Sequence, residues 1–321
     1  AAMNAWDELV ERCARRRLKK LGPLSDEAYA ELVLAVREDP ESFIEDASER
    51  AMLVMARALD AYRASCRNDD LLDDAAFEAE RSRRLAKAHA EFARAREIDE
   101  TSLDARLLEL ITEDGDPYDL FMGLNELERN FPSDEPPAGD AWDDVFFRPH
   151  LRLRAALTRS CLDTAHYSMA VRGASSLMDI SPSDPLGARH TCALALARLE
   201  DEKGFDELDA RFSRQGDPWS HLARVILLYK LDRMSAARRA LHGFDQLCRG
   251  GAYALLRPTY VEPYLPDRPD VTPGGFEESV FAVREAEPII ADVPDFINWC
   301  QGHDWLVASA RQFAEKNDLD W

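Results

Sequence analysis

Small and large apolar residues alternate at helical spacing along much of this chain, and this pattern constrains the fold more than any other feature of the sequence. It occurs at Ala88, Phe92 and Ala95, at Tyr167, Ala170, Ala174 and Leu177, and at Ala237, Leu241 and Phe244. A small residue where two helices cross lets the backbones approach, and a large residue fills the next layer. A single helix pair of this length cannot bury its apolar face, so neighbouring pairs must stack.

The amino-acid composition favours the same architecture. The chain has only 14 glycines among 321 residues, too few for long flexible linkers or a β architecture with many tight turns. Its length exceeds the size at which one compact core stops growing, which favours two domains or an elongated stack. We therefore predict an all-α fold, an α-α superhelix of helix pairs.

The regularity of the pattern divides the chain into three predicted regions. Residues 1–70 form an N-terminal helical region, with helices at 5–21, after Ser25 and from 40 or 41 to 66. Residues 71–251 hold the repeats, and residues 252–321 hold a proline-rich connection and helices that cap the stack. An acidic cluster near residue 70 lacks the spacing of a calcium loop and indicates a helix start.

Within the repeats, each second helix is preceded by a candidate first helix. The predicted first helices are 151–162, 186–199 and 219–231, and a shorter second helix is predicted at 205–212. The segment 131–147 is too long for an ordinary turn, and we expect it to dock Trp142, Phe146 and Phe147 on the next helix.

The net charge of -21 argues against nucleic acid and anionic membranes as partners. A local basic run is the exception: Arg12, Arg15, Arg16, Arg17, Lys19 and Lys20. Its spacing wraps around a helix, which favours a solvated first helix over a binding face. No apolar stretch approaches the roughly 20 residues that span a bilayer, and the amino terminus lacks a signal-peptide core, so we expect a cytoplasmic protein.

Motifs for catalysis or metal binding are missing from the sequence. It contains no G-x-S-x-G, H-E-x-x-H or G-x-x-x-x-G-K motif. Cys300 and His303 lack a second ligand pair nearby, as zinc would require. Cys192, close to His190, lies in an alanine-rich run and is predicted to be a core residue. We expect a protein without catalytic residues, metal or cofactor.

Basic residues on the predicted first helices are the candidate binding residues. In helical solenoids the first helix of each pair lines the groove, where arginine offers a fixed fork to a carboxylate. The candidates are Arg148, Arg152, Arg154, Arg189, His190, His221 and Arg224. In the structural alternative, several of these residues pair with Asp179, Asp184 or Asp217 and only stabilise the loops between repeats.

Residues 147 to about 299 resemble a group of uncharacterised bacterial tetratricopeptide-repeat proteins. The strings that carry the resemblance are RPHLRLRAAL (148–157), ISPSDPLGAR (180–189), LRPTYVEPYLP, GGFEESVFAV and INW. The positions of Arg154, Thr158 and Cys161 depart from the repeat consensus, which leaves individual repeat boundaries open. The resemblance implies a helical scaffold for protein interaction, with no catalytic residues to carry over.

Three functions remain open from the sequence. The first is a non-enzymatic scaffold whose groove binds an unidentified partner protein or peptide through an acidic segment. The second is a structural subunit that self-associates through its repeat ends. The third, with less support, is an adaptor that contacts nucleic acid through the basic run at residues 12–20.

Overall fold

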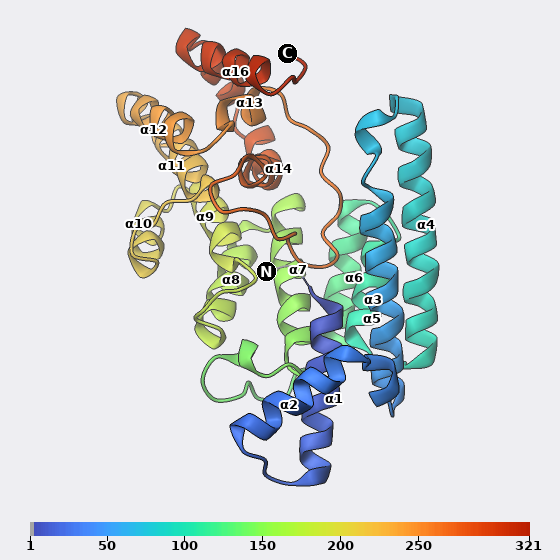
Figure 1. Cartoon of the computed structure of the whole chain (residues 1–321). Helices are drawn as coiled ribbons and strands as arrows, with labels where there is room; N and C mark the ends of the chain where they lie inside the picture. The colour runs from blue at the N-terminus through green and yellow to red at the C-terminus, as the bar shows by residue number, and fades with distance from the viewer. Residues whose placement is uncertain (1–2) are drawn as a thin grey trace. The chain divides into compact units, whose positions relative to one another are not determined.

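The computed structural model describes residues 3–321, and within them the regular elements are sixteen α-helices and three short 3-10 helices (Figure 1). The all-α prediction is confirmed. Contacts divide the chain into two compact units: unit 1 comprises the residues up to 156 with 263–269, and unit 2 comprises 157–262 with 270–321. The three-region division by repeat pattern stays a prediction.

Unit 1 contains the elements of the first half of the chain. They are α1 (Ala5–Leu21), α2 (Asp26–Glu38), η1 (Pro40–Phe43), α3 (Ala47–Ser65), η2 (Asp69–Leu71), α4 (Asp74–Ile98), α5 (Leu103–Ile111), α6 (Pro117–Asn130), η3 (Ala141–Asp143) and the start of α7 (Arg148–Asp163).

Unit 2 begins within α7 and contains the remaining elements. They are α8 (Tyr167–Ile180), α9 (Ala188–Arg198), α10 (Glu202–Arg211), α11 (Pro218–Lys230), α12 (Met234–Leu247), α13 (Gly251–Leu256), α14 (Phe276–Ala291), α15 (Phe296–Gln301) and α16 (Asp304–Lys316).

Side-chain caps explain where several helices of unit 1 begin. Ser25 accepts a hydrogen bond from the Ala28 backbone N–H, which confirms the predicted start of α2. Asp73 does the same for the Ala76 N–H, so this member of the acidic cluster caps α4. The third helix begins later than predicted, because Asp46 caps α3 and the preceding residues form η1.

The core of unit 1 lies where α3 packs between α1, α4 and α5. Apolar side chains at helical spacing meet there, and those that lose nearly all solvent exposure include Leu9, Cys13, Met52, Met55, Leu59 and Phe92. The apolar stripe of α3 therefore packs in the core of unit 1.

Unit 2 is built from helices that pack in pairs. The helix α9 packs against α8, α10 and α11, and α11 packs against α12. Ala170 and Ala174 on α8 and Ala237 on α12 have no exposed surface, as expected for small residues at helix crossings. The predicted first helices correspond to α7, α9 and α11, and the predicted second helix at 205–212 to α10.

Gly173 on α8 provides a stability test of the α7–α8 crossing. A Cβ at this position would lie 2.7 Å from the Thr158 hydroxyl on α7, whereas a Cβ at Gly243 on α12 would meet nothing within 4 Å. Gly173→Ala is therefore expected to destabilise the protein by about 1 to 3 kcal/mol through overpacking. Gly243→Ala is expected to stabilise it by about 0.5 to 1 kcal/mol through helix propensity. Urea unfolding followed by circular dichroism measures both, and equal shifts would contradict the close crossing.

The carboxy-terminal third departs from the prediction in one helix. No helix was predicted directly after the 237–244 pattern, yet Gly251 begins α13, and Gly250 precedes it with a φ of 66°. The predicted irregular connection is confirmed, because no helix lies between α13 and α14. The last helices pack back on earlier ones: α14 lies against α9, α11 and α13, and α16 lies against α13 and α12.

The aromatic end of the segment at 131–147 docks only in part. Phe147 is buried, and the Arg148 guanidinium lies 4.7 Å from the centre of the Trp142 ring. The prediction was wrong for Phe146, which is 48% exposed beside the Lys19 ammonium group. Across residues 3–321, no helix has both the length and the apolar character needed to cross a membrane.

Candidate functional site

The predicted binding residues fall into two groups that belong to different units. Arg148, Arg152 and Arg154 lie in unit 1, and the remaining candidates, Arg189, His190, His221 and Arg224, lie in unit 2. The second group gathers around one pocket between α9, α10 and α11. This pocket is the candidate functional site.

The pocket has an apolar floor and a polar rim, with an empty volume of about 340 Å³. Its lining residues are Arg189, His190, Ala193, Phe205, Leu208, Asp209, Phe212, Gln215, Asp217 and Ser220. The floor side chains come mainly from α10 and its C-cap residue, since Phe205 and Leu208 of the helix and Phe212 after it recur at helical spacing.

Arg189 is the cation best placed to receive a ligand. Its guanidinium carbon lies 4.9 Å from the centre of the Phe212 ring, and its side chain is 35% exposed. The nearest carboxylate oxygens are 3.7 Å away on Asp184 and 4.0 Å away on Asp217, beyond hydrogen-bond distance. Within the described residues its side-chain N–H groups therefore donate no hydrogen bond to those carboxylates.

Asp217 and His190 form the buried wall beside Arg189. Asp217 caps α11 by accepting a 2.8 Å hydrogen bond from the Ser220 N–H, and burial raises the pKa of its carboxyl group. His190 Nδ1 lies 3.6 Å from Asp217, and its ring stacks on Trp219 with centroids 3.9 Å apart. These contacts fix the shape of the wall and leave His190 only 8% exposed.

Arg224 supports the floor of the pocket from α11. Its guanidinium carbon lies 5.0 Å from the centre of the Phe205 ring, and a guanidinium N–H donates a 3.2 Å hydrogen bond to Asp209. His221 packs against Gly216 so closely that no Cβ would fit there, and burial lowers the pKa of its imidazole. The neutral form of His221 is therefore favoured near pH 7, and Arg189 and Arg224 supply the positive charge.

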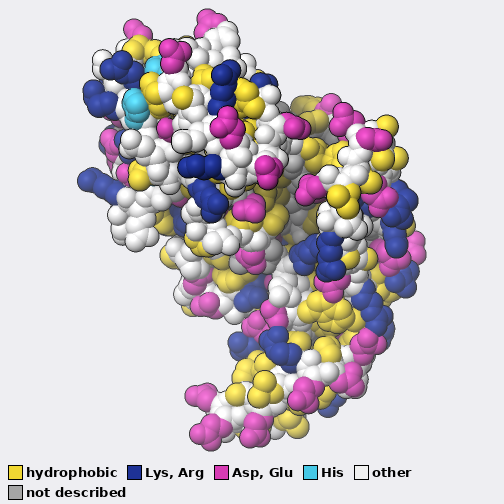
Figure 2. Space-filling model, turned by 45° about the horizontal axis from the view of Figure 1, so that its top comes forward, with side chains coloured by type: hydrophobic (Ala, Val, Ile, Leu, Met, Phe, Trp, Pro, Cys, Tyr) yellow, Lys and Arg dark blue, Asp and Glu magenta, His cyan; other side chains and the backbone are white. Residues whose placement is uncertain are grey.

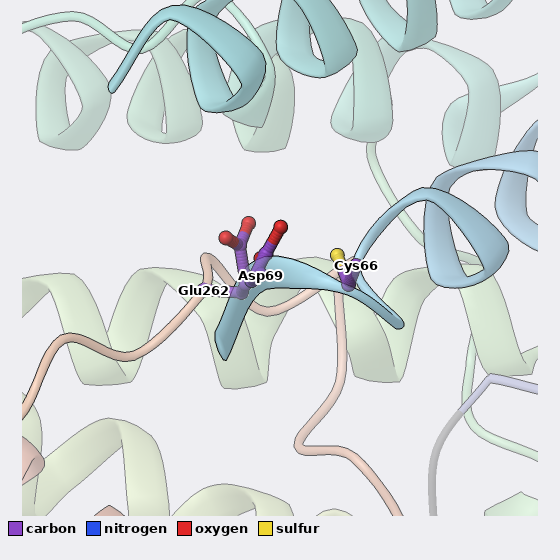
Figure 3. A group of neighbouring side chains, drawn as sticks. All are labelled: Cys66, Asp69 and Glu262. Atoms are coloured by element: carbon purple, nitrogen blue, oxygen red, sulfur yellow. The ribbon is translucent and has the colours of Figure 1, made fainter. Parts of the chain in front are cut away.

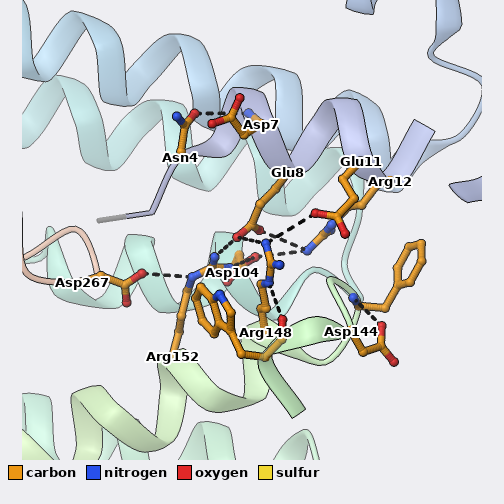
Figure 4. A network of polar contacts seen from close by, with 12 residues as sticks. Asn4, Asp7, Glu8, Glu11, Arg12, Asp104, Asp144, Arg148, Arg152 and Asp267 are labelled. Carbon is orange, nitrogen blue, oxygen red and sulfur yellow. Dashed lines mark hydrogen bonds and ion pairs between the residues drawn. The ribbon is translucent and has the colours of Figure 1, made fainter. Parts of the chain in front are cut away.

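The arginine at position 152 is instead the centre of a buried ion cluster in unit 1 (Figure 4). Its side chain has no exposed surface and contacts three carboxylates: Asp267 at 3.2 Å, Asp104 at 3.3 Å, and Glu8. Burial alone lowers the pKa of Arg152, but these carboxylates outweigh it and raise the pKa above its ordinary value. Arg152 is thus a structural cation in this fold.

The two neighbouring arginines of unit 1 are also engaged within the chain. Arg148 donates a 2.8 Å hydrogen bond to the Trp142 carbonyl and lies 3.6 Å from Glu8 (Figure 4). Arg154 donates a 2.7 Å hydrogen bond to the Ser133 hydroxyl. These arginines stabilise loops and helix contacts through partners other than the predicted Asp179, Asp184 and Asp217, whereas Arg189 is the candidate that lies beside Asp184 and Asp217.

Several side chains of the basic run on α1 pair with acidic side chains of unit 1. Arg16 contacts Glu45 and Glu49 at 2.5 Å, and Arg17 and Lys20 pair with Glu45 as well. On the face drawn in Figure 2, acidic and basic side chains are interspersed over the surface. This pairing favours the structural interpretation of the run over a nucleic-acid interface.

Two cysteines of the described chain have surroundings that can be compared with those of a reactive thiol or a metal ligand. Cys66 and Asp69, drawn in Figure 3, both accept hydrogen bonds from the buried guanidinium of Arg84. A cation bound to these two side chains would have to displace Arg84. Burial raises the pKa of the Cys192 thiol to about 12, so its nucleophilic thiolate form is suppressed.

The chain matches no protein-family model, no curated protein and no solved structure. The assignment of the candidate site therefore depends on its geometry. Sequence reasoning identified Arg189, His190, His221 and Arg224 but missed the floor residues of α10. The spacing of Phe205, Leu208 and Phe212 was a usable signal, because these residues share one face of a short helix.

Proposed function

We propose that unit 2 is a tetratricopeptide-like scaffold that binds an acidic segment of a partner protein and catalyses no reaction. A carboxylate of the partner accepts hydrogen bonds from the Arg189 guanidinium, and an adjacent apolar side chain lies on Phe205, Leu208 and Phe212. The observation that carries the proposal is the position of Arg189, stacked on Phe212 at the rim of an apolar hollow. An arginine that stacks on an aromatic ring and keeps guanidinium N–H groups exposed can bind a carboxylate through two hydrogen bonds.

The charges around the pocket support an anionic ligand. Asp209 is paired with Arg224 at 3.2 Å. Asp217 is committed to capping α11, and its carboxyl group has a raised pKa. Arg189 is the cation of the pocket whose neighbouring carboxylates, Asp184 at 3.7 Å and Asp217 at 4.0 Å, both lie beyond hydrogen-bond distance.

A charge reversal at Arg189 tests this proposal with a library of fluorescent peptides that alternate Glu or Asp with apolar residues. The peptide that binds wild type best is expected to lose at least tenfold in affinity with Arg189→Glu, because a close charge-paired hydrogen bond is worth about 1.5 to 3 kcal/mol. Arg189→Lys should lose less, because lysine keeps the charge and loses the fork.

Arg238→Glu is the matched control, since it makes the same charge change at an exposed position of α12. It is expected to leave the affinity within about twofold, as for a distant rim charge. Equal losses for the two reversals, measured by fluorescence anisotropy, would show that only the net charge matters and would contradict the pocket as the binding site.

Self-association is the second candidate, and one surface residue favours it. Leu247, at the end of α12, is 68% exposed. If it lies in a contact between copies, sedimentation velocity should show a dimer that Leu247→Ser converts to a monomer and that Arg189→Glu leaves intact. A monomer at every concentration would exclude this function.

A further inference from the structure

The helix α14 lies across the first helices of successive pairs in unit 2. It packs against α9, α11 and α13, and Figure 1 shows it almost end-on between them. The helices α9 and α11 each open a pair, with α10 and α12, and α13 packs against α16. The face that first helices present together is therefore covered by a helix from the same chain.

The connection to α14 differs from the connections inside the pairs. The helix α9 ends at Arg198 and α10 begins at Glu202, and α11 ends at Lys230 and α12 begins at Met234. The chain before α14, by contrast, runs without a helix from 257 to 275. Within this connection residues 263–269 pack in unit 1, where Asp267 contacts Arg152, so the six residues 270–275 lead from that packed stretch into α14.

The contact surface of α14 is made of small apolar side chains. Ser279, Ala282, Ala286 and Ile289 have no exposed surface, and Val283 is nearly as buried. One carboxylate also fixes the orientation of α14, since Glu285 accepts a 3.0 Å hydrogen bond from the Trp219 indole N–H on α11. An amphipathic helix with this arrangement of residues fits the face of the three first helices.

Polar contacts fix the two ends of α14. The Ser279 hydroxyl donates a 2.8 Å hydrogen bond to the Arg249 carbonyl. At the other end Asp292 accepts hydrogen bonds from Arg198 at 2.9 Å and from the Tyr167 hydroxyl at 3.0 Å, and both lower the pKa of its carboxyl group. The helix is held by a buried stripe and end contacts, as a bound peptide helix would be.

We propose that the face formed by α9, α11 and α13 is a helix-binding surface that the chain's own α14 occupies. The partner is an amphipathic helix with a stripe of Ala-sized side chains and a carboxylate in the position of Glu285, and it binds by displacing α14. The surface is separate from the Arg189 pocket, so the inference goes beyond the proposed function and fails or holds independently of it.

A labelled peptide of residues 276–291 is the probe, and the full chain is the receptor. The chain carrying Ala282→Glu and Ala286→Glu, which place carboxylates at buried positions of α14, should bind the peptide at least tenfold more tightly than wild type. A peptide with its own Ala286→Glu should not bind, and one with the exposed Glu277→Gln should bind unchanged. Adding Arg189→Glu to the receptor should leave peptide affinity unchanged, which separates this surface from the pocket.

Hydrogen exchange of the unaltered chain tests the same proposal without a variant. The amides of α14 are expected to exchange through an opening at least tenfold more frequent than that of α9 and α11. Exchange of all three helices through one common opening would show that α14 is an integral part of the core and would overturn the proposal. So would a folded double variant that binds no peptide, or one that forms dimers by exchanging α14 between copies.

Discussion

Replacing Arg152 with alanine is expected to lower the free energy of unfolding by about 3 to 5 kcal/mol, because it leaves buried carboxylates without their cation. Glu8, Asp104 and Asp267 are each less than 5% exposed, so water cannot replace the lost partner. Urea unfolding followed by circular dichroism measures the change. Adding Glu8→Gln to Arg152→Ala should recover part of the loss by removing one uncompensated charge.

Arg15→Ala is the matched control for this prediction. Arg15 is on the same helix as Glu8, its side chain is 47% exposed, and its ion pair with Glu11 is 3.7 Å long. Exposed pairs of this kind contribute about 0 to 1 kcal/mol. If Arg152→Ala were no more destabilising than Arg15→Ala, the buried cluster would stabilise the fold no more than an exposed, solvated ion pair does. Its structural role would then be rejected.

Gly250→Ala is expected to destabilise the protein by about 2 to 5 kcal/mol, combining a left-handed backbone penalty with overpacking. The residue has a φ of 66°, and a Cβ there would lie 2.6 Å from the Phe313 ring and still closer to the ring of Phe276. Both rings pack together with centroids 4.9 Å apart and cannot both retreat. The measurement is thermal or urea unfolding of the full chain.

Gly274 separates the two contributions. It has a φ of 75°, yet a Cβ there would meet nothing within 4 Å. Gly274→Ala should therefore cost only the backbone penalty of about 1 to 2 kcal/mol. Equal losses at the two positions would mean that the rings beside Gly250 can move aside, contrary to the packing described.

Local signals allowed much of the fold to be predicted. The first helix was predicted at 5–21 and spans Ala5–Leu21, because its ends coincide with an acidic first turn and a glycine that ends the helix. Ser25 likewise located the start of α2. The predicted helix pairs of unit 2 followed from small residues, such as Ala170 and Ala237, that the fold buries completely.

Short helices without that pattern were not predicted. The helices α5 and α6 lack the alternation of small and large residues at the spacing used to detect repeats. The helix α13 begins within a glycine pair, with Gly250 as its N-cap residue and Gly251 as its first residue. Glycine has a low helix propensity, so local propensity does not predict a helix there.

Local sequence patterns predicted the roles of the candidate site residues even less completely than the helices. Arg152 and Arg189 look equivalent in sequence, since each is a basic residue on a first helix. Their difference lies in partners far along the chain: Arg152 contacts Asp104, 48 residues earlier, and Asp267, 115 residues later. No local pattern reports such contacts. Arg189, by contrast, has its neighbours within α9 to α11, and its pocket was partly predictable.

The contribution of Asp267 to the Arg152 cluster affects how the nascent chain acquires its structure. Domains emerge from the ribosome amino terminus first and generally begin to fold as they emerge. Unit 1, however, includes residues 263–269, so its buried arginine lacks one of its three carboxylates until most of unit 2 has been synthesised. Translation thus delivers the last ionic contact of the first unit near the end of the chain, and a polypeptide arrested before residue 267 carries an incompletely neutralised cation.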